Sequence, residues 1–179
     1  MSATYVSPTT YRTVTVVSSS ANDTAAGTGM RTLELTGVTA SGIETEIITL
    51  NGTTPVTSTK SYACIIESEG ETWGSTLNNV GAITITATTD LSIQNIIPAT
   101  FNEAYSGVFM CPTGYKAYLL AWGCDAQNAT NTTQVDAFLL KKNNFSGGWA
   151  QEDSIHLYLS GNSSREKTYH GGIYIQPMR

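Results

Sequence analysis

Two histidines, three cysteines and a few clustered carboxylates are the residues of this chain that could carry chemistry. A nucleophilic Ser-His-Asp or Cys-His site requires a histidine, and only His156 and His170 occur. His156 lies in an alternating strand pattern beside Asp153, and His170 lies in a Gly-rich turn. Neither stands near a Gly-x-Ser-x-Gly motif. We therefore expect His156 to be an outward strand residue and the protein not to be an enzyme, with no catalytic residues.

The cysteines lack the spacing of a zinc or redox site. Cys64, Cys111 and Cys124 are odd in number, and no two of them are separated by two residues. We expect free, largely buried thiols, with a Cys111–Cys124 disulfide as the leading alternative. The spacing of an EF-hand and that of a Gly-rich phosphate loop are also absent. The sequence therefore predicts no metal and no cofactor.

Carboxylates cluster in two places. Glu67, Glu69 and Glu71 alternate, so one face of a strand would carry them in a row. Such a row could bind a cation, but it is more typical of a solvated strand edge that resists pairing with another sheet. Glu152 and Asp153 are adjacent, so a strand would point them to opposite faces. That placement disfavours the paired acids of a glycoside hydrolase.

Aromatic side chains in or near turns are the feature best suited to binding. Trp73, Trp149, Tyr158 and Tyr169 occupy such positions. Aromatic faces in loops stack on sugars and anchor protein interfaces. For each of the four, packing beneath a loop is the alternative. They are our candidate exposed binding aromatics.

The composition predicts an all-β fold. The chain has 28 Thr and 17 Ser among 179 residues, and only 13% of its residues are charged, about half of the ~25% that is typical of soluble domains. Thr suits a pleated surface, whereas the helix formers are scarce. A helical bundle, a coiled coil and a Rossmann-type enzyme are therefore disfavoured. The net charge of -5 argues against nucleic acid as a partner.

Short strand patterns separated by turns run along the chain and favour an antiparallel β-sandwich or jelly roll. The region from Ile43 to Leu50 has apolar residues on both parities, which indicates a bulge or a strand covered on both faces. Thr dominates before residue 100 and aromatics after it. We expect two β units, 11–98 and 107–179, joined around residues 98–106.

Residues 1–10 are expected to form an N-terminal arm. The segment is uncharged and carries Tyr5, Val6 and Pro8, so it could lie extended across a neighbouring subunit, with a frayed terminus as the alternative. It lacks the basic and apolar regions of a secretion signal. No apolar run reaches 18 residues, so we expect no membrane partner.

Four stretches resemble a family of virion structural proteins from tailed bacteriophages of aquatic bacteria. They are VVSSSANDTAAGTG at 16–29, RTLELTGV at 31–38 followed by ETEIITLNGTTPV at 44–56, NVGAITI at 79–85, and CPTGYKAYL at 111–119. The second stretch is the most specific, and the match covers about residues 14–140. The family is identified from strands and turns, so the resemblance implies no active site.

The resemblance implies a non-enzymatic virion protein that is assembled in the host cytoplasm. Within that class we expect a capsid decoration or cement protein that binds the assembled major capsid lattice and stabilises it, as a homotrimer. The alternative is a head-fibre, neck or tail-associated module that binds a host receptor or surface glycan. A hydrolase such as a depolymerase is a third hypothesis, and it would require a cleft with two close acids.

Overall fold

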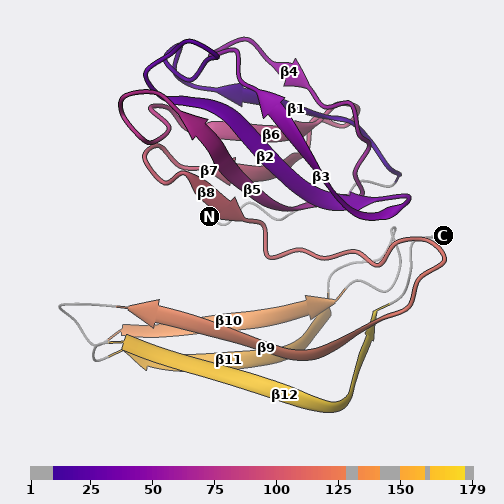
Figure 1. The fold of residues 1–179 in the computed structure, drawn as a ribbon. Helices are drawn as coiled ribbons and strands as arrows, with labels where there is room; N and C mark the ends of the chain where they lie inside the picture. The colour runs from indigo at the N-terminus through magenta and orange to yellow at the C-terminus, as the bar shows by residue number, and fades with distance from the viewer. Residues whose placement is uncertain (1–9, 128–132, 142–149, 160–161, 176–179) are drawn as a thin grey trace. The chain divides into compact units, whose positions relative to one another are not determined.

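The computed structural model describes residues 10–127, 133–141, 150–159 and 162–175, which contain twelve β-strands and no helix. The all-β class predicted from composition is therefore confirmed. The chain divides into two compact units, one that extends to Gly114 and one that begins at Tyr115 (Figure 1). Each unit is described by itself below.

The N-terminal unit is a sandwich of two antiparallel sheets. Its strands are β1 Val14–Ser18, β2 Met30–Thr39, β3 Gly42–Thr49, β4 Val56–Thr57, β5 Cys64–Trp73, β6 Ile83–Ala87, β7 Ile93–Ile97 and β8 Glu103–Tyr105. One sheet has the order β4-β1-β6-β7 and the other β3-β2-β5-β8. Strands β7 and β8 are thus edge strands, one in each sheet.

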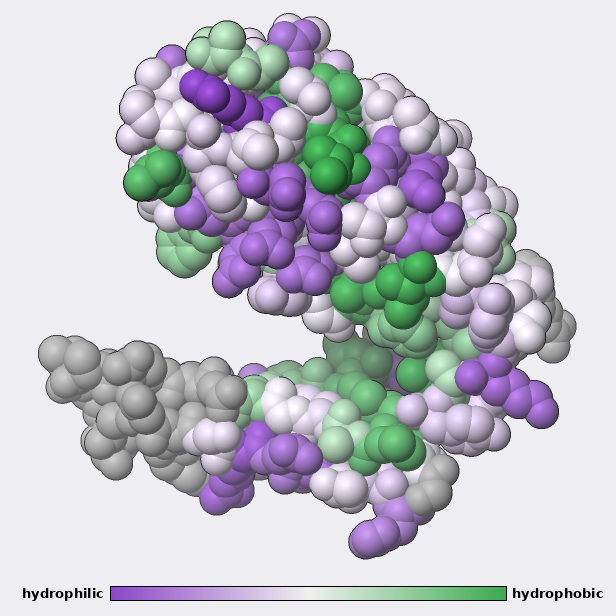
Figure 2. Space-filling view, in the orientation of Figure 1, coloured by the Kyte–Doolittle hydropathy of each residue, from purple (hydrophilic) through white to green (hydrophobic). Residues whose placement is uncertain are grey.

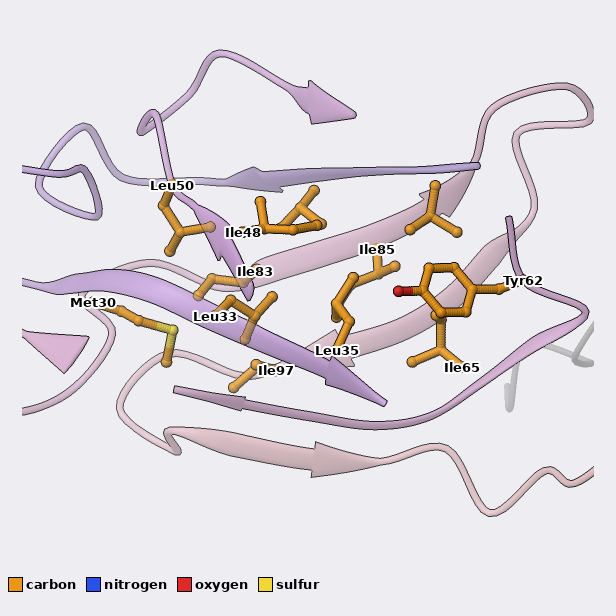
Figure 3. Packing of buried hydrophobic residues seen from close by; sticks show 12 residues of the cluster. Met30, Leu33, Leu35, Ile48, Leu50, Tyr62, Ile65, Ile83, Ile85 and Ile97 are labelled. Carbon is orange, nitrogen blue, oxygen red and sulfur yellow. The ribbon is translucent and has the colours of Figure 1, made fainter. Parts of the chain in front are cut away.

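Apolar residues that alternate along the strands of both sheets meet in one core (Figure 3). Val16 of β1 pairs with Ile85 of β6 in one sheet, and Leu33 of β2 pairs with Ile48 of β3 in the other. Twelve side chains of this cluster are buried, and each such burial contributes about 1.5–3 kcal/mol. The buried residues are Val14, Val16, Met30, Leu33, Leu35, Ile48, Leu50, Tyr62, Ile65, Ile83, Ile85 and Ile97.

Strand β3 has neither the bulge nor the two-sided cover that its mixed pattern indicated. It pairs with β2 in an unbroken register, with Ile48 buried and Ile43 and Ile47 exposed. The register decides this, because Leu33 of β2 pairs with Ile48. Glu46 lies two residues before Ile48, so its side chain is also on the inner side of this edge strand.

Glu46 is satisfied there by the loop that follows β4. Its carboxylate accepts hydrogen bonds from the backbone N–H of Thr59 at 2.7 Å and of Lys60 at 3.1 Å, and from the Tyr62 hydroxyl at 3.1 Å. Partial burial by itself raises the pKa of Glu46, but these hydrogen bonds together have a larger effect in the opposite direction. The pKa of Glu46 therefore lies below its ordinary value. The carboxylate therefore links β3 to this loop by hydrogen bonds.

The boundary between the units falls later than the sequence indicated. Residues 98–106 are not a linker, because β8 pairs with β5 through Glu103↔Glu69 and Tyr105↔Glu67. The N-terminal unit therefore extends past residue 98, and the C-terminal unit does not start at 107. The predicted contact residues Tyr5, Val6 and Pro8 lie outside the described residues.

The C-terminal unit consists of two antiparallel ribbons. Its strands are β9 Ala117–Gln127, β10 Thr133–Lys141, β11 Ala150–Leu159 and β12 Asn162–Ile175. Strand β10 pairs with β11, and β12 pairs with β9. Ile155 and Leu157 of β11 are buried, and Trp122 and Cys124 of β9 pack against them. All three cysteines are free thiols, so the alternative of a Cys111–Cys124 disulfide is wrong.

A buried carboxylate joins three segments of the N-terminal unit. Asp23 is fully buried, and it accepts hydrogen bonds from Ser18 Oγ at 2.6 Å and from the backbone N–H groups of Met30, Val80 and Gly81, each at 2.9 Å. These four donors replace the water that the charge loses on burial. Asp23 thereby fixes the end of β1, the start of β2 and the entry to β6.

We predict that Asp23→Asn lowers the free energy of unfolding by about 3 kcal/mol. The new amide would point N–H groups at backbone N–H donors and leave them unsatisfied. Urea denaturation measures the change. The matched control is Glu71→Gln on the exposed face of β5, with an expected effect below about 0.5 kcal/mol. A loss below about 1 kcal/mol for Asp23→Asn would contradict this role.

We also predict that Glu46→Gln removes a pH-dependent contribution to stability. Because the folded pKa of Glu46 is lowered, the wild-type contribution is present above the ordinary value and is lost as the pH falls through the folded one. The variant should be less stable by about 1–2 kcal/mol at pH 7, and the difference should shrink as the pH falls below the ordinary pKa of a glutamate. Chemical denaturation across this range measures it, and a difference that does not depend on pH would contradict the prediction.

Candidate functional site

Trp73 is not an exposed binding aromatic, so that prediction is wrong. It ends β5, is half-buried and packs against the core of the N-terminal unit. A Cβ at Gly70 would lie 2.8 Å from its Nε1, so the indole occupies the space that a side chain at residue 70 would fill. The buried Nε1 has no hydrogen-bond partner. Trp149 and the side chain of Tyr158 lie outside what the structure describes.

Tyr169 is committed to a polar network inside the C-terminal unit. Its hydroxyl donates to Asp153 Oδ2 at 2.6 Å and accepts from Trp122 Nε1 at 2.8 Å. Lys167 Nζ lies 2.5 Å from Asp153 Oδ1. The lysine bond, followed by those of Tyr169 and the Ser154 N–H, holds the pKa of Asp153 well below its usual range. The half-buried Tyr169 side chain therefore ties β9, β11 and β12 together and is not free for a ligand.

Ser154, His156 and Asp136 form a hydrogen-bonded row that the sequence did not indicate. His156 Nδ1 lies 2.7 Å from Asp136 Oδ1, and its Nε2 lies 3.4 Å from Ser154 Oγ. His156 is exposed, as expected, and sits opposite Asp136 in the ladder of β10 and β11. The Ser154 N–H donates to Asp153 Oδ1, so it is not available to a developing oxyanion. The row has the order of a catalytic triad on an exposed strand face, without that donor.

An acidic face covers the outer side of the β3-β2-β5-β8 sheet. Glu34, Glu69 and Glu103 lie side by side on β2, β5 and β8, and hydrophilic residues gather in the middle of this unit in Figure 2. The Glu67, Glu69 and Glu71 row was expected at a sheet edge, but β5 lies between β2 and β8. Like charges directly opposite one another are destabilising, so this face is suited to a basic or cationic neighbour.

The side of the sandwich formed by β7 and β8 carries exposed apolar residues. Asn95 of β7 donates to Ala104 O of β8 at 2.9 Å and to Ser68 Oγ of β5 at 3.1 Å, which joins the two sheets at this side. We define the β7–β8 side by the exposed residues of these strands and of the loops beside them. They are Leu77, Leu91, Ile93, Ile96, Phe101 and Tyr105.

Strained backbone holds part of this side in place. Leu77, Thr100 and Asn102 have φ values of 56°, 70° and 64°, in the left-handed region that costs non-glycine residues free energy. Leu77 is 72% exposed and Phe101 is 66% exposed. The strain therefore accompanies two large apolar side chains that are held in solvent, and such outliers are typical of functional positions.

Asn79 and Asn102 lock these two loops together. The N–H of Asn79 donates to Asn102 Oδ1 at 3.2 Å, and the N–H of Asn102 donates to Asn79 Oδ1 at 3.1 Å. Asn79 is fully buried, and its Nδ2 also donates to the carbonyls of Gly81 and Pro98. Both loops thus depend on one buried amide.

Sequence reasoning missed this surface. The sequence predicts that residues 98–106 join two units, and Leu77 stands alone before two asparagines, Asn78 and Asn79. A large apolar residue isolated in a polar turn was the available signal. It does not distinguish a side chain that folds back onto the core from one that is held in solvent.

Comparisons with protein-family models, with curated proteins and with solved structures find no match for this chain. Within the described ranges, no group of three or more His, Cys, Asp or Glu residues is arranged to hold a metal ion. No helix in the part of the chain that the structure describes is long and apolar enough to cross a membrane.

We predict that Asn79→Ala lowers the free energy of unfolding by about 2–3 kcal/mol, because it leaves several backbone groups of the two loops unsatisfied. The double variant Leu77→Ser/Phe101→Ser should change it by less than about 0.5 kcal/mol, because both side chains are exposed. Urea denaturation compares the two. A large loss from the double variant would show that these side chains support the fold, and it would rule them out as a free binding surface.

Proposed function

We propose that this chain is a non-enzymatic virion structural protein, and within that class a capsid decoration protein. It attaches to the assembled major capsid lattice through the β7–β8 side and assembles with further copies of itself as a homotrimer. The observation that carries the proposal is the β7–β8 side itself. Exposed apolar residues stand on the two edge strands β7 and β8 and on the loops beside them, and strained backbone accompanies two of them, Leu77 and Phe101.

The exposure of the β7–β8 side supports a macromolecular partner. Its six apolar residues are between 44% and 73% exposed, and exposed apolar surface is typical of protein–protein contacts. A standard interface takes about 800 Å² from each partner. The large, flat surface of a capsid lattice can cover an apolar strip of this kind.

Preorganisation supports a stabilising role. The Asn79–Asn102 lock fixes the loops before any partner arrives, so binding costs little ordering entropy. A protein that binds only the assembled lattice shifts the equilibrium away from disassembly by mass action. The resemblance to virion structural proteins in the strand and turn motifs at 31–38 and 44–56 points in the same direction.

The row of Ser154, His156 and Asp136 does not favour an enzyme. An acyl-transfer site needs donors for the oxyanion and a pocket that excludes water. Here the Ser154 N–H is engaged by Asp153, and His156 stands on an exposed strand face. These features support a surface hydrogen-bond network.

One observation favours the alternative of a receptor- or glycan-binding module of a head fibre, neck or tail. Phe101 and Tyr105 are exposed on either side of Glu103, and aromatic faces beside a carboxylate are suited to a sugar. The Tyr105 hydroxyl is bonded to Glu67, which raises the pKa of Tyr105. The β7–β8 side then contacts a host glycan.

We predict that the wild-type chain rebinds capsids of the phage that encodes it after they have been stripped of it, and that it raises their melting temperature. Leu77→Ser/Phe101→Ser should weaken binding at least tenfold, because the apolar anchors of the contact are lost. The matched control is Ile43→Ser/Ile47→Ser, which removes two apolar side chains that are also more than half exposed from the outer face of β3.

Co-sedimentation over a concentration series measures binding, and scanning calorimetry of the capsids measures stabilisation. Wild-type protein that ignores the capsids but binds host polysaccharide would establish the glycan-binding alternative. Equal loss of capsid binding in both double variants would contradict the assignment of the contact to the β7–β8 side.

A further inference from the structure

The sequence contains one Asn-Gly step, Asn51-Gly52, in the loop that follows β3. An asparagine is chemically least stable before a glycine, because glycine has no Cβ to hinder its backbone nitrogen. That nitrogen can attack the side-chain amide carbon of the asparagine. Asn51 is exposed, whereas Gly52 is buried. The amide that would react is therefore open to solvent, and the nitrogen that would attack it lies within the fold.

Hydrogen bonds engage both backbone polar groups of Gly52. Its N–H donates to the carbonyl oxygen of Asp23 at 2.8 Å, and its carbonyl oxygen accepts the N–H of Ser18 at 3.0 Å. Asn51 also forms an antiparallel bridge with Thr24. The Gly52 nitrogen must lose its proton before it can attack, and a buried, hydrogen-bonded proton is reached by a base only when the structure opens locally. The bond to Asp23 therefore withholds the nucleophile while the loop is closed.

The fold requires a glycine at this step. Gly52 has a φ of 59°, in the left-handed region that favours glycine. A Cβ at this position would lie 3.0 Å from the Cα of Ala21. A bulkier residue, which would slow the reaction, is thus disfavoured by both backbone strain and contact. The structure keeps a reactive step in place and protects it by hydrogen bonds.

The carboxylate of Asp23 supports this protection from the other end of the same residue. We call residues 18–24 the Asp23 loop. Ser18 Oγ donates to Asp23 Oδ2 at 2.6 Å and accepts the N–H of Ser20 at 3.0 Å. Ser18 thus holds Asp23 with its hydroxyl and Gly52 with its backbone N–H. Loss of the hydroxyl should loosen the segment that binds Gly52.

We propose that Asn51-Gly52 is a deamidation site and that opening of the Asp23 loop sets its rate. In the open state the deprotonated Gly52 nitrogen forms a bond to Asn51 Cγ. The Cγ–Nδ2 bond breaks, ammonia leaves and a cyclic succinimide remains. Water then opens the ring at either of its two carbonyls, which leaves aspartate or isoaspartate. One water is taken up and one ammonia is released for each residue that reacts.

Isoaspartate makes the opening permanent. It routes the main chain through the side-chain carbons of residue 51 and so adds one methylene group before Gly52. The bonds of Gly52 to Asp23 and Ser18 then lose the geometry on which they depend. The site thus converts time spent in the open state into a lasting loosening of the Asp23 loop.

The test follows deamidation of the full chain in mildly alkaline buffer by peptide mass spectrometry, and enzymatic methylation identifies isoaspartate. A synthetic peptide of residues 46–57 gives the unprotected rate. We expect the native chain to react about a hundredfold more slowly than the peptide, or more slowly still, because only the open state reacts. Ser18→Ala should raise the rate of the native chain about tenfold, because it removes a hydrogen bond to the Asp23 carboxylate.

The matched control is Ile65→Val. Ile65 is fully buried and pairs with Gly37, at the opposite end of β2 from Met30, whose N–H bonds Asp23. The substitution therefore destabilises the same unit without touching the Asp23 loop. Its deamidation rate should stay within about twofold of the wild type, since local opening needs no global unfolding. Equal acceleration by both variants would show reaction from the unfolded chain and would overturn the inference.

Hydrogen exchange of the wild type keeps the test informative if Ser18→Ala does not fold. The Gly52 amide should exchange slowly, and the fraction of time that it is open should account for the deamidation rate. A Gly52 amide that exchanges without protection, or a native chain that reacts as fast as the peptide, would contradict the proposal. Neither measurement involves capsids or oligomers, so its outcome is independent of the proposed function.

Discussion

The carboxylate of Asp23 is the interaction on which the N-terminal unit depends most. It is one charge, fully buried, and its donors come from three separate segments of the chain. Because it bonds the N–H groups of Val80 and Gly81, it also fixes the loop in which Asn79 stands. Asn79 in turn is reciprocally bonded to Asn102. The path from a buried carboxylate to the exposed Leu77 and Phe101 is therefore a continuous chain of hydrogen bonds.

This chain of contacts explains how a protein can keep large apolar side chains in water. A flexible loop would fold Leu77 or Phe101 back onto the sandwich, since burial of either side chain is favourable by about 2 kcal/mol. The left-handed backbone at Leu77, Thr100 and Asn102 opposes that movement, and the stability of the core supports the strain.

The strands were largely predictable from alternation, whereas their partners were not. Val14 and Val16 of β1 and Ile83 and Ile85 of β6 are recognisable as half-buried strand residues in the sequence alone. The side on which β3 faces the core depended on the register with β2, which no local pattern encodes. Strand β8 has three residues, and its partner Glu67 lies 38 positions before Tyr105, so its local pattern was that of a connector.

For the candidate site, Trp73 was misplaced because only the fold shows that its ring lies over Gly70. Positive φ at Leu77 carries no glycine signal, which is why the strained loops were not anticipated.

Several copies of the β7–β8 side would reinforce one another in the proposed assembly. A single β7–β8 side that contacts a lattice gives modest affinity, since part of any interface remains at its solvated rim. Joining three copies in the proposed homotrimer makes the second and third contacts intramolecular, and their effective concentration raises the overall affinity by 10²–10⁴-fold without any new contact. Symmetry then sets which lattice positions are occupied, because only sites related by a matching axis can engage all three sides at once. The acidic outer face of the β3-β2-β5-β8 sheet adds repulsion between free copies, so apolar contacts form at defined surfaces and not at random. In a protein with so few charged residues, the acidic face has to be separate from the apolar contact surfaces, because solubility before assembly depends on the positions of its few carboxylates.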